Sequence, residues 1–254
     1  MKALRAQTIE DELDIIVIDN HSDDESIGYI RSQTKNMPRV RIVETPKNIG
    51  YGCGNNEGLR LVHSPWTLII NPDNRLPPDG LEHMIEVMSR DTSIGIAGPK
   101  LVYNDGTIRP SARSFPTLRD LLWKRLWPDH WHRAYNQSME PLLRETIVET
   151  DWIVGACLFM RTDDLRRLGG FDPRFFLFFE DIDLCRRMKN ELGKRAVYLP
   201  NIAVQDRRGR LSGSHAWSLL TRKTTRIHLW SAIKYGWKWR RMYKQSASFC
   251  SHKP

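Results

Sequence analysis

Short apolar runs alternate with amphipathic segments in the first part of the chain. The runs, expected as strands, are 13–18, 40–43, 66–70 and 94–101, and the expected helices between them are 26–33, 57–62 and 78–89. Continuous apolar runs are typical of strands buried on both faces, and alternation of strands with helices favours parallel pairing. The sequence therefore predicts an α/β fold with a mostly parallel central sheet flanked by helices.

The second half of the chain is patterned less regularly. Residues 103–150 hold turn residues, prolines and tryptophans, and we interpret them as an insertion or lid and not as a regular sheet unit. The expected elements after this insertion are a strand, two helices and a strand, at 154–161, 162–168, 181–192 and 195–199. We expect these elements to complete a domain over 1–206, followed at 207–254 by a helical tail rich in cations and tryptophan, without Asp or Glu.

Composition narrows the class of protein without naming it. The formal net charge is +9, which favours anionic partners such as nucleotides, nucleic acid or a membrane surface. The four cysteines are scattered, and no CxxC pair indicates a zinc site. Residues 1–12 lack the apolar core of a signal peptide, and no run approaches the roughly 20 residues of a membrane span. We expect a cytoplasmic protein, soluble or peripheral at the inner face of the membrane.

Carboxylates stand where ligands of α/β proteins bind. Asp19 and Asp73 each follow an expected strand, and Glu180 and Asp181 begin an expected helix. In open α/β sheets, ligands bind beyond the carboxyl ends of the strands. Acidic residues in the first turn of a helix also stabilise its dipole, so each of them has an ordinary structural interpretation. Three acidic sites together favour a ligand-binding centre.

A glycine-rich segment at 50–56 resembles a nucleotide-binding loop only in composition. The pattern GxGxxG fails because Asn55 and Glu57 stand where a third glycine is required, and no Gly-Lys-Ser/Thr follows. Two interpretations stay open: glycines that let the backbone approach a ligand, or a tight turn from a strand into a helix.

Six motifs occur in one order along the chain. They are IVIDNHSDD (16–24), NIGYGCGNNEG (48–58), LIINPD (68–73), GACLFMR (155–161), GGFD (169–172) and FFEDIDLCRR (178–187). This series resembles family-2 glycosyltransferases, especially the bacterial rhamnosyltransferase-like branch, over about 13–210. The resemblance implies a GT-A fold and inverting transfer of a sugar, such as rhamnose, from a nucleotide-diphosphate donor such as dTDP-rhamnose. The acceptor would be a polysaccharide or a lipid-linked glycan.

The resemblance also implies roles for single residues. Asp73 would ligate Mg²⁺ or Mn²⁺ on the donor diphosphate, Asp181 would be the general base, and Glu180 would orient Asp181 or the acceptor. Asp19 would hydrogen-bond the base or the ribose. The residues expected to bind the nucleotide sugar are Asp19, Asn20, Ser22, Asn48, Gly50, Gly52, Asn55, Asn71 and Asp73. Asp183 and Arg187 stand four apart on one helix and are expected to form a structural ion pair.

Two departures from the family pattern bear on activity. Family members begin with a strand that carries a T-Y-N-like motif; here that strand would precede Met1, so the sheet is expected to lack it. A family histidine near the metal is replaced by Gln205 and Asp206, of which Asp206 either substitutes as a ligand or is unused. The alternative to an active enzyme is therefore a truncated, inactive glycosyltransferase that acts as a binding or accessory protein.

The basic tail has three interpretations. A nucleic-acid partner is not favoured, because no recognised nucleic-acid motif accompanies the cations. Basic residues and tryptophans suit the anionic surface of a membrane, so the tail is expected to be a peripheral anchor. A solvated helix that packs its tryptophans on the domain is the structural alternative.

Overall fold

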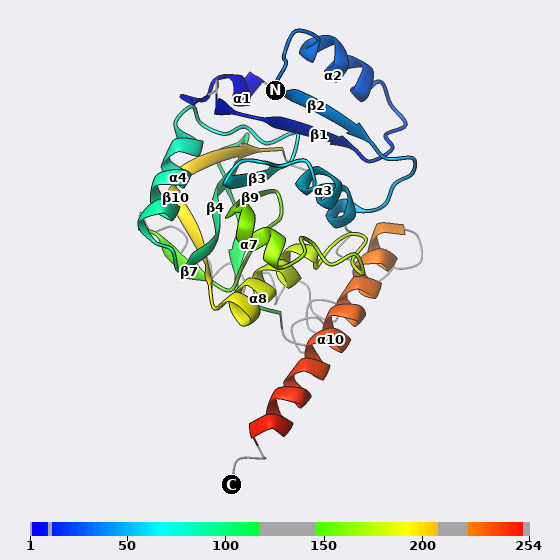
Figure 1. The fold of residues 1–254 in the computed structure, drawn as a ribbon, viewed down its shortest axis with the longest axis vertical. Helices are drawn as coiled ribbons and strands as arrows, with labels where there is room; N and C mark the ends of the chain where they lie inside the picture. Colours follow the sequence, from blue (N-terminus) through cyan, green and yellow to red (C-terminus); the bar gives the residue numbers. More distant parts are fainter. Residues whose placement is uncertain (1, 10–11, 117–145, 208–222, 251–254) are drawn as a thin grey trace.

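The computed structural model describes residues 2–9, 12–116, 146–207 and 223–250 (Figure 1). Its largest sheet has the strand order β3–β9–β4–β10–β7, with β5 paired to β4. The bounds are β3 (Trp66–Ile70), β9 (Cys157–Arg161), β4 (Ile94–Tyr103), β10 (Arg195–Asp206), β7 (Val148–Thr150) and β5 (Ile108–Arg109). The central part of the expected insertion, with its three tryptophans, lies outside the described residues.

The sheet mixes parallel and antiparallel pairing. β4 and β10 are parallel, as the alternation of strands and helices predicts. β9 lies between β3 and β4 and is antiparallel to both, so β3, β4 and β10 run in one direction. The short strands β5 and β7 are antiparallel additions from the segment expected to be irregular, so its two flanks do join the sheet. A further pair, β6 (Ala112–Arg113) and β8 (Trp152–Ile153), closes the base of that segment.

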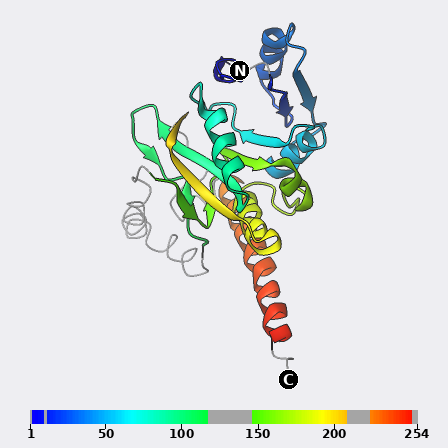
Figure 2. The same ribbon diagram turned by 60° about the vertical axis from the view of Figure 1, so that its left-hand side comes forward.

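Helices cover both faces of the sheet, which confirms the predicted α/β class (Figures 1 and 2). The helices of the described residues are α1 (Lys2–Arg5), α2 (Ser26–Thr34), α3 (Tyr51–Leu59), α4 (Gly80–Arg90), α7 (Thr162–Arg167), α8 (Glu180–Leu192) and α10 (Lys223–Cys250), of which α2 lies beside β1 and β2 and not on the large sheet. β9 shows the two-sided burial directly: Leu158 and Met160 belong to the core that includes α8, and Phe159 belongs to the core under α4.

The first two strands form a sheet of their own. β1 (Ile15–Asp19) and β2 (Val40–Glu44) are parallel, and among the described residues neither is hydrogen-bonded to the larger sheet. Every residue of β1 is only half-buried, although its apolar sequence predicted burial on both faces. A strand with a single neighbour has one open edge, which explains the difference. The expectation of a sheet without its first strand stays a prediction.

The glycine-rich segment is a helix and not a loop. α3 begins at Tyr51, although glycine costs a helix about 1 kcal/mol relative to alanine. The reason is close packing on β1: a Cβ added at Gly58 would lie 3.2 Å from the side chain of Ile18. Gly50, just before the helix, has φ +92°, and a Cβ there would lie 2.4 Å from the carbonyl oxygen of Phe176. Glycine is therefore required by backbone geometry and packing.

A buried carboxylate joins α8 to α10. Asp183 is fully buried and accepts a hydrogen bond from Arg187 Nε at 2.8 Å, which confirms the predicted ion pair. Lys238 Nζ lies 2.6 Å from the same carboxylate, and Trp239 Nε1 donates to it at 3.0 Å. Arg187 also donates to the carbonyl of Gly170. These contacts fix α8, α10 and the 168–172 turn relative to one another.

The basic tail is consequently integrated into the domain where it is described. Ala232, Tyr235 and Trp239 of α10 belong to the same core as α8 and β9. The opposite face of α10 leaves Trp230 and Trp237 exposed. The buried face of α10 thus fits the structural alternative, whereas the peripheral anchor and the domain boundary at residue 206 stay predictions.

Candidate active site

The centre of the site is the backbone at Gly155 and Ala156, just before β9. The carbonyl of Ala156 accepts the N–H of Asn71 at 2.9 Å, which holds the end of β3. On the other side, Gly155 donates its N–H to Asp181 Oδ2 at 2.8 Å and accepts the hydroxyl of Tyr51 at 2.5 Å. A Cβ at Gly155 would lie 3.3 Å from that of Asp181, so glycine permits this approach. Motifs far apart in the chain therefore meet at one point.

The backbone that leads into α8 is strained. Phe178 and Phe179 have φ values of 67° and 69°, in the left-handed region that bulky residues rarely adopt. Their rings pack on His228 of α10, with ring centroids 4.9 and 5.4 Å apart. Packing of this kind maintains a conformation that the local sequence does not favour. It orients Glu180, the first residue of α8, into the interior.

Glu180 and Asp181 are adjacent carboxyl groups in different surroundings. Glu180 is 5% exposed, and its Oε2 has no hydrogen-bond partner among the described residues. Burial, followed by repulsion from Asp181, raises the pKa of Glu180 to about 8. Burial also raises the pKa of Asp181, but backbone N–H groups of Gly155 and Ile182 stabilise its ionised form. Near neutral pH Glu180 therefore holds a proton, and Asp181 is the carboxyl group of the pair whose ionised form has hydrogen-bond donors.

The loop after β1 uses its polar side chains to fix its own shape. Asn20 Oδ1 accepts the N–H of Ile49 and the hydroxyl of Thr45, both at 3.0 Å. Its Nδ2 donates to the carbonyl of Gly50 at 3.0 Å and to Asn48 Oδ1 at 3.2 Å. These bonds occupy the amide of Asn20, so Asn20 and Asn48 position the loop. Direct contact of either amide with a nucleotide stays a prediction.

Other residues that were predicted to bind the nucleotide sugar form contacts within the protein. Asp19 is half-buried at the end of β1, and its carboxylate accepts the N–H of Ser22 at 3.3 Å, so these two lie together. Asn55 donates within α3 to the carbonyl of Tyr51. A Cβ added at Gly52 would lie 2.9 Å from Cβ of Phe171, which is a packing constraint.

One carboxylate after the end of β3 is suited to bind a hard cation. Asp73 is exposed, and no cation pairs with it among the described residues. Asp206 is buried and forms an ion pair with Arg109 at 2.5 Å, so it is not free to act as a ligand. In the amide orientation that satisfies its neighbours, Asn74 donates to Asp206 at 3.0 Å and to Asp73 at 3.3 Å. The described residues contain no cluster of three metal-binding side chains. Mg²⁺ commonly needs one or two carboxylates, with substrate phosphates supplying further ligands.

Four residues that act on the site were not predicted as site residues. Tyr51 and Gly155 stand inside quoted motifs, but spacing alone did not show that they meet at Asp181. Asn56 forms two hydrogen bonds of 2.8 Å with the backbone of Phe171, which tie α3 to the GGFD turn. An asparagine in a glycine-rich helix was the available signal. Burial raises the pKa of Asp181, and the charge of Arg113, from the insertion, opposes that rise.

Comparisons of sequence relate this chain to known proteins. Residues 1–164 match the family model described as Glycosyl transferase family 2. The chain is 28% identical over 248 residues to an N-acetylglucosaminyl-diphospho-decaprenol L-rhamnosyltransferase of Mycobacterium tuberculosis, covering 91% of this chain and 78% of that protein. It is 32% identical over 114 residues to rhamnosyltransferase WbbL of Escherichia coli, covering 43% of this chain and 41% of that protein.

Solved structures share the fold at low sequence identity. GalNAc-T7, crystallised with UDP, GalNAc and Mn²⁺, aligns with a TM-score of 0.60 and 11% identity, over 84% of this chain and 42% of that chain. TarS of S. aureus in complex with UDP aligns with a TM-score of 0.55 and 15% identity, over 83% and 56%. This chain thus spans about half the length of these two structures.

The raised pKa of Glu180 predicts a pH-dependent stability. Below about pH 4.5 Glu180 is protonated in the folded and unfolded states; above about pH 8 it is ionised in both, at a cost to the folded state. The free energy of unfolding should therefore fall as pH rises across this window. Glu180→Gln should weaken that fall, and chemical denaturation between pH 5 and about 9 measures it.

Glu191→Gln is the matched control, because Glu191 is exposed near the end of the same helix. It should keep the pH dependence of the wild type. An unchanged pH dependence in Glu180→Gln would contradict the assignment of the proton to Glu180.

Proposed function

Because this chain belongs to glycosyl transferase family 2, we propose that it is an inverting enzyme of the rhamnosyltransferase-like branch. It transfers a sugar from a nucleotide-diphosphate donor, with dTDP-rhamnose as the proposed donor, to a lipid-linked glycan. The relative from Mycobacterium tuberculosis, by its name, acts on a sugar joined to decaprenol through a diphosphate. An acceptor of that chemical class is proposed here for the same reason.

The observation that carries the proposal is the state and position of Asp181. This carboxyl group is partly exposed and accepts hydrogen bonds from two backbone N–H groups at 2.8 Å. Its neighbour Glu180 is protonated near neutral pH, so it adds no negative charge beside the hydroxyl oxygen that becomes negative as it loses its proton. A base with a raised pKa is also better matched to proton transfer near neutral pH. The site thus holds one oriented base and one buried acid side by side.

The proposed reaction is a single displacement. Asp181 accepts the proton of the acceptor hydroxyl while the hydroxyl oxygen attacks the anomeric carbon of the donor sugar. The bond from that carbon to the diphosphate breaks, and the nucleoside diphosphate leaves with the bonding electrons. Attack opposite the leaving group inverts the anomeric configuration. Tyr51 and Gly155 keep Asp181 in place during this step.

Asp73 is the residue proposed to hold a divalent cation, Mg²⁺ or Mn²⁺. When bound, such an ion offsets charge on the leaving diphosphate. The support is the exposed carboxylate of Asp73 at the end of β3, whereas Asp206 is neutralised by Arg109. Asp206 is accordingly proposed as a structural residue and not as a substitute for the family histidine.

The exposed face of α10 is proposed to lie on a membrane surface. Leu229, Trp230, Ile233 and Trp237 are exposed at helical spacing, on the side opposite the buried Tyr235. Aromatic and aliphatic side chains next to cations are typical of interfacial helices. None of the helices that the described residues form has the length and apolar character required to cross a bilayer.

Removal of the base tests the reaction. Asp181→Asn should lower kcat about 10²–10⁴-fold, because an amide cannot accept the proton. The amide would also face one of two backbone N–H groups, so donor binding and thermal stability are measured alongside turnover. Glu180→Gln is the control that keeps the protonated shape and should lose less than tenfold. Turnover that is unaffected by Asp181→Asn would move the role to Glu180; absence of turnover in the wild type would favour an accessory protein.

Removal of the metal ligand tests the cation site. Chelation should abolish turnover, and Mg²⁺ or Mn²⁺ should restore it in the wild type. Asp73→Ala should need far more metal for the same rate, whereas Asp163→Ala, an exposed change at the opposite end of β9, should behave as the wild type. Full activity in the presence of chelator and in Asp73→Ala would exclude a catalytic cation at this position.

Vesicle sedimentation tests the membrane surface. The protein should bind vesicles with anionic lipid more strongly than neutral ones, and less strongly as salt rises, because each Lys or Arg contributes about 1 kcal/mol. Trp237→Ala should weaken binding, and Tyr29→Ala, which removes another exposed aromatic ring on α2, should not. Equal binding to both vesicle types would assign the exposed face a purely structural role.

A further inference from the structure

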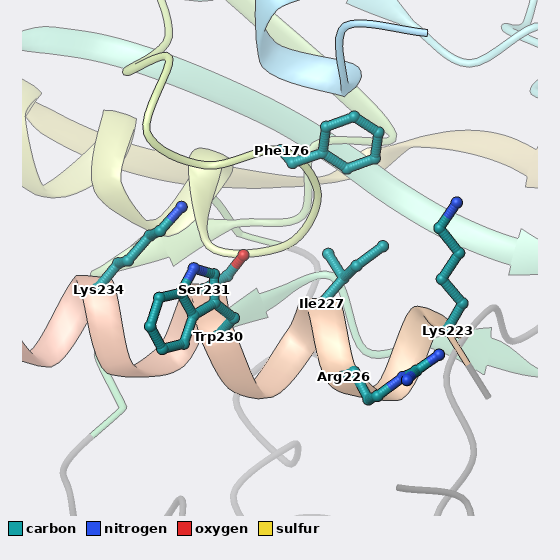
Figure 3. Close-up of a pocket in the computed structure, with 7 residues that line it drawn as sticks. All are labelled: Phe176, Lys223, Arg226, Ile227, Trp230, Ser231 and Lys234. Carbon is teal, nitrogen blue, oxygen red and sulfur yellow. The ribbon is translucent and has the colours of Figure 1, made fainter. Parts of the chain in front are cut away.

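A pocket of about 380 Å³ lies between the first half of α10 and the loop that carries Phe176 (Figure 3). Its lining residues are Phe176, Lys223, Arg226, Ile227, Trp230, Ser231 and Lys234. The volume is in the range of small-molecule sites, about 300–1,000 Å³. None of the residues proposed to bind the donor lines this pocket, so it is a separate place in the molecule.

The pocket holds three cations and no carboxylate. Lys223 and Arg226 are exposed, and neither forms an ion pair within the part of the chain that the structure describes. Lys234 donates to the carbonyl of Arg174 at 2.8 Å, which leaves two of its three N–H groups. Lys223 and Lys234 lie at the two ends of the pocket. Both side chains extend from α10 toward the side on which Phe176 lies (Figure 3). A phosphate-bearing ligand bound in the pocket would supply these cations with an anionic partner.

Apolar side chains share the pocket with these cations. Ile227 lies between the two lysines, and the rings of Phe176 and Trp230 are 38% and 60% exposed. Trp230 also belongs to the exposed apolar face of α10, which continues through Ile233 to Trp237. The pocket therefore offers charge for an anionic group and, leading away from it, a continuous surface for a hydrocarbon chain.

The loop beside the pocket also leads to the base. The carbonyl of Phe176 accepts the N–H of Tyr51 at 2.9 Å, and Tyr51 bonds Gly155, which bonds Asp181. On its other side, the loop accepts the hydroxyl of Ser231 at the carbonyl of Leu177, at 2.8 Å. One short loop thus separates the cations from the catalytic carboxylates.

We propose that this pocket binds the diphosphate of an isoprenoid-diphosphate-linked acceptor, with the first isoprene units against Trp230 and Phe176. The proposal rests on the proposed function for its acceptor class and goes beyond it in assigning the residues. Lys223, Arg226 and Lys234 hold the diphosphate, the sugar extends past the Phe176 loop toward Asp181, and the hydrocarbon chain leaves along α10. Acceptors are then selected by their diphosphate as well as by their sugar.

Direct binding of farnesyl diphosphate, in the absence of donor, tests the assignment in the full chain. Binding is measured by tryptophan fluorescence. The double variant Lys223→Gln/Arg226→Gln should bind this probe at least tenfold more weakly than the wild type. Lys35→Gln/Arg39→Gln removes one lysine and one arginine that are equally exposed, far from the pocket, and should bind like the wild type. Farnesol and inorganic pyrophosphate should each bind the wild type at least tenfold more weakly than farnesyl diphosphate.

A second experiment, with vesicles, distinguishes binding of the acceptor from binding of the membrane. If the pocket variant loses binding to phosphatidylglycerol vesicles but binds farnesyl diphosphate like the wild type, the cations serve lipid headgroups and the proposal is wrong. Equal affinity of both double variants for farnesyl diphosphate would also overturn it. In turnover assays, the KM of the pocket variant for the diphosphate-linked acceptor should be at least tenfold higher than that of the wild type. The KM for the donor should change little. A catalytically inactive wild type that still shows the binding difference would refute the proposed function alone.

Discussion

Asp183 places a negative charge inside the core, and the arrangement of the site depends on how that charge is balanced. Arg187 from α8 and Lys238 from α10 supply the cations, and Trp239 adds an N–H. Loss of one partner of a buried ion pair typically costs about 3–5 kcal/mol, so these helices are held in one relative position. Since Glu180 and Asp181 lie on the turn before Asp183, the same contacts aim the two carboxylates. They also set α10 against the Phe176 loop and so form the pocket.

Local patterns predicted what local physics determines. The ion pair of Asp183 and Arg187 follows from a spacing of four on a helix, and most strands and helices follow from apolar periodicity. The beginning of α3 was missed because glycines disfavour helices, while the contacts that justify them involve Ile18 and Phe171, both distant in sequence. The position of β9 between β3 and β4, antiparallel to both, was missed for the same reason. The sequence of one strand does not show which other strands it pairs with.

For the site, the sequence predicted chemical types better than contacts. Asp73 and Asp181 stand at the end of a strand and at the start of a helix, as expected, and the family assignment is confirmed. The difference between Glu180 and Asp181 was not predictable, because it depends on one backbone N–H from Gly155 and on how deeply each carboxylate is buried. Asn20 was selected for its motif, yet its hydrogen bonds serve the loop that it belongs to.

The two faces of α10 lie in different environments. This difference affects how the helix can diverge among relatives. Positions equivalent to Tyr235 and Trp239 must change together with the core and with α8, because they are buried there. Ile233 and Trp237, on another face of the same helix, are exposed and do not belong to that core. In the membrane contact that we propose, substitutions on the exposed face of α10 would change the contact with lipid without disturbing the carboxylates. Contact with lipid and the chemistry of sugar transfer would then depend on separate faces of one element.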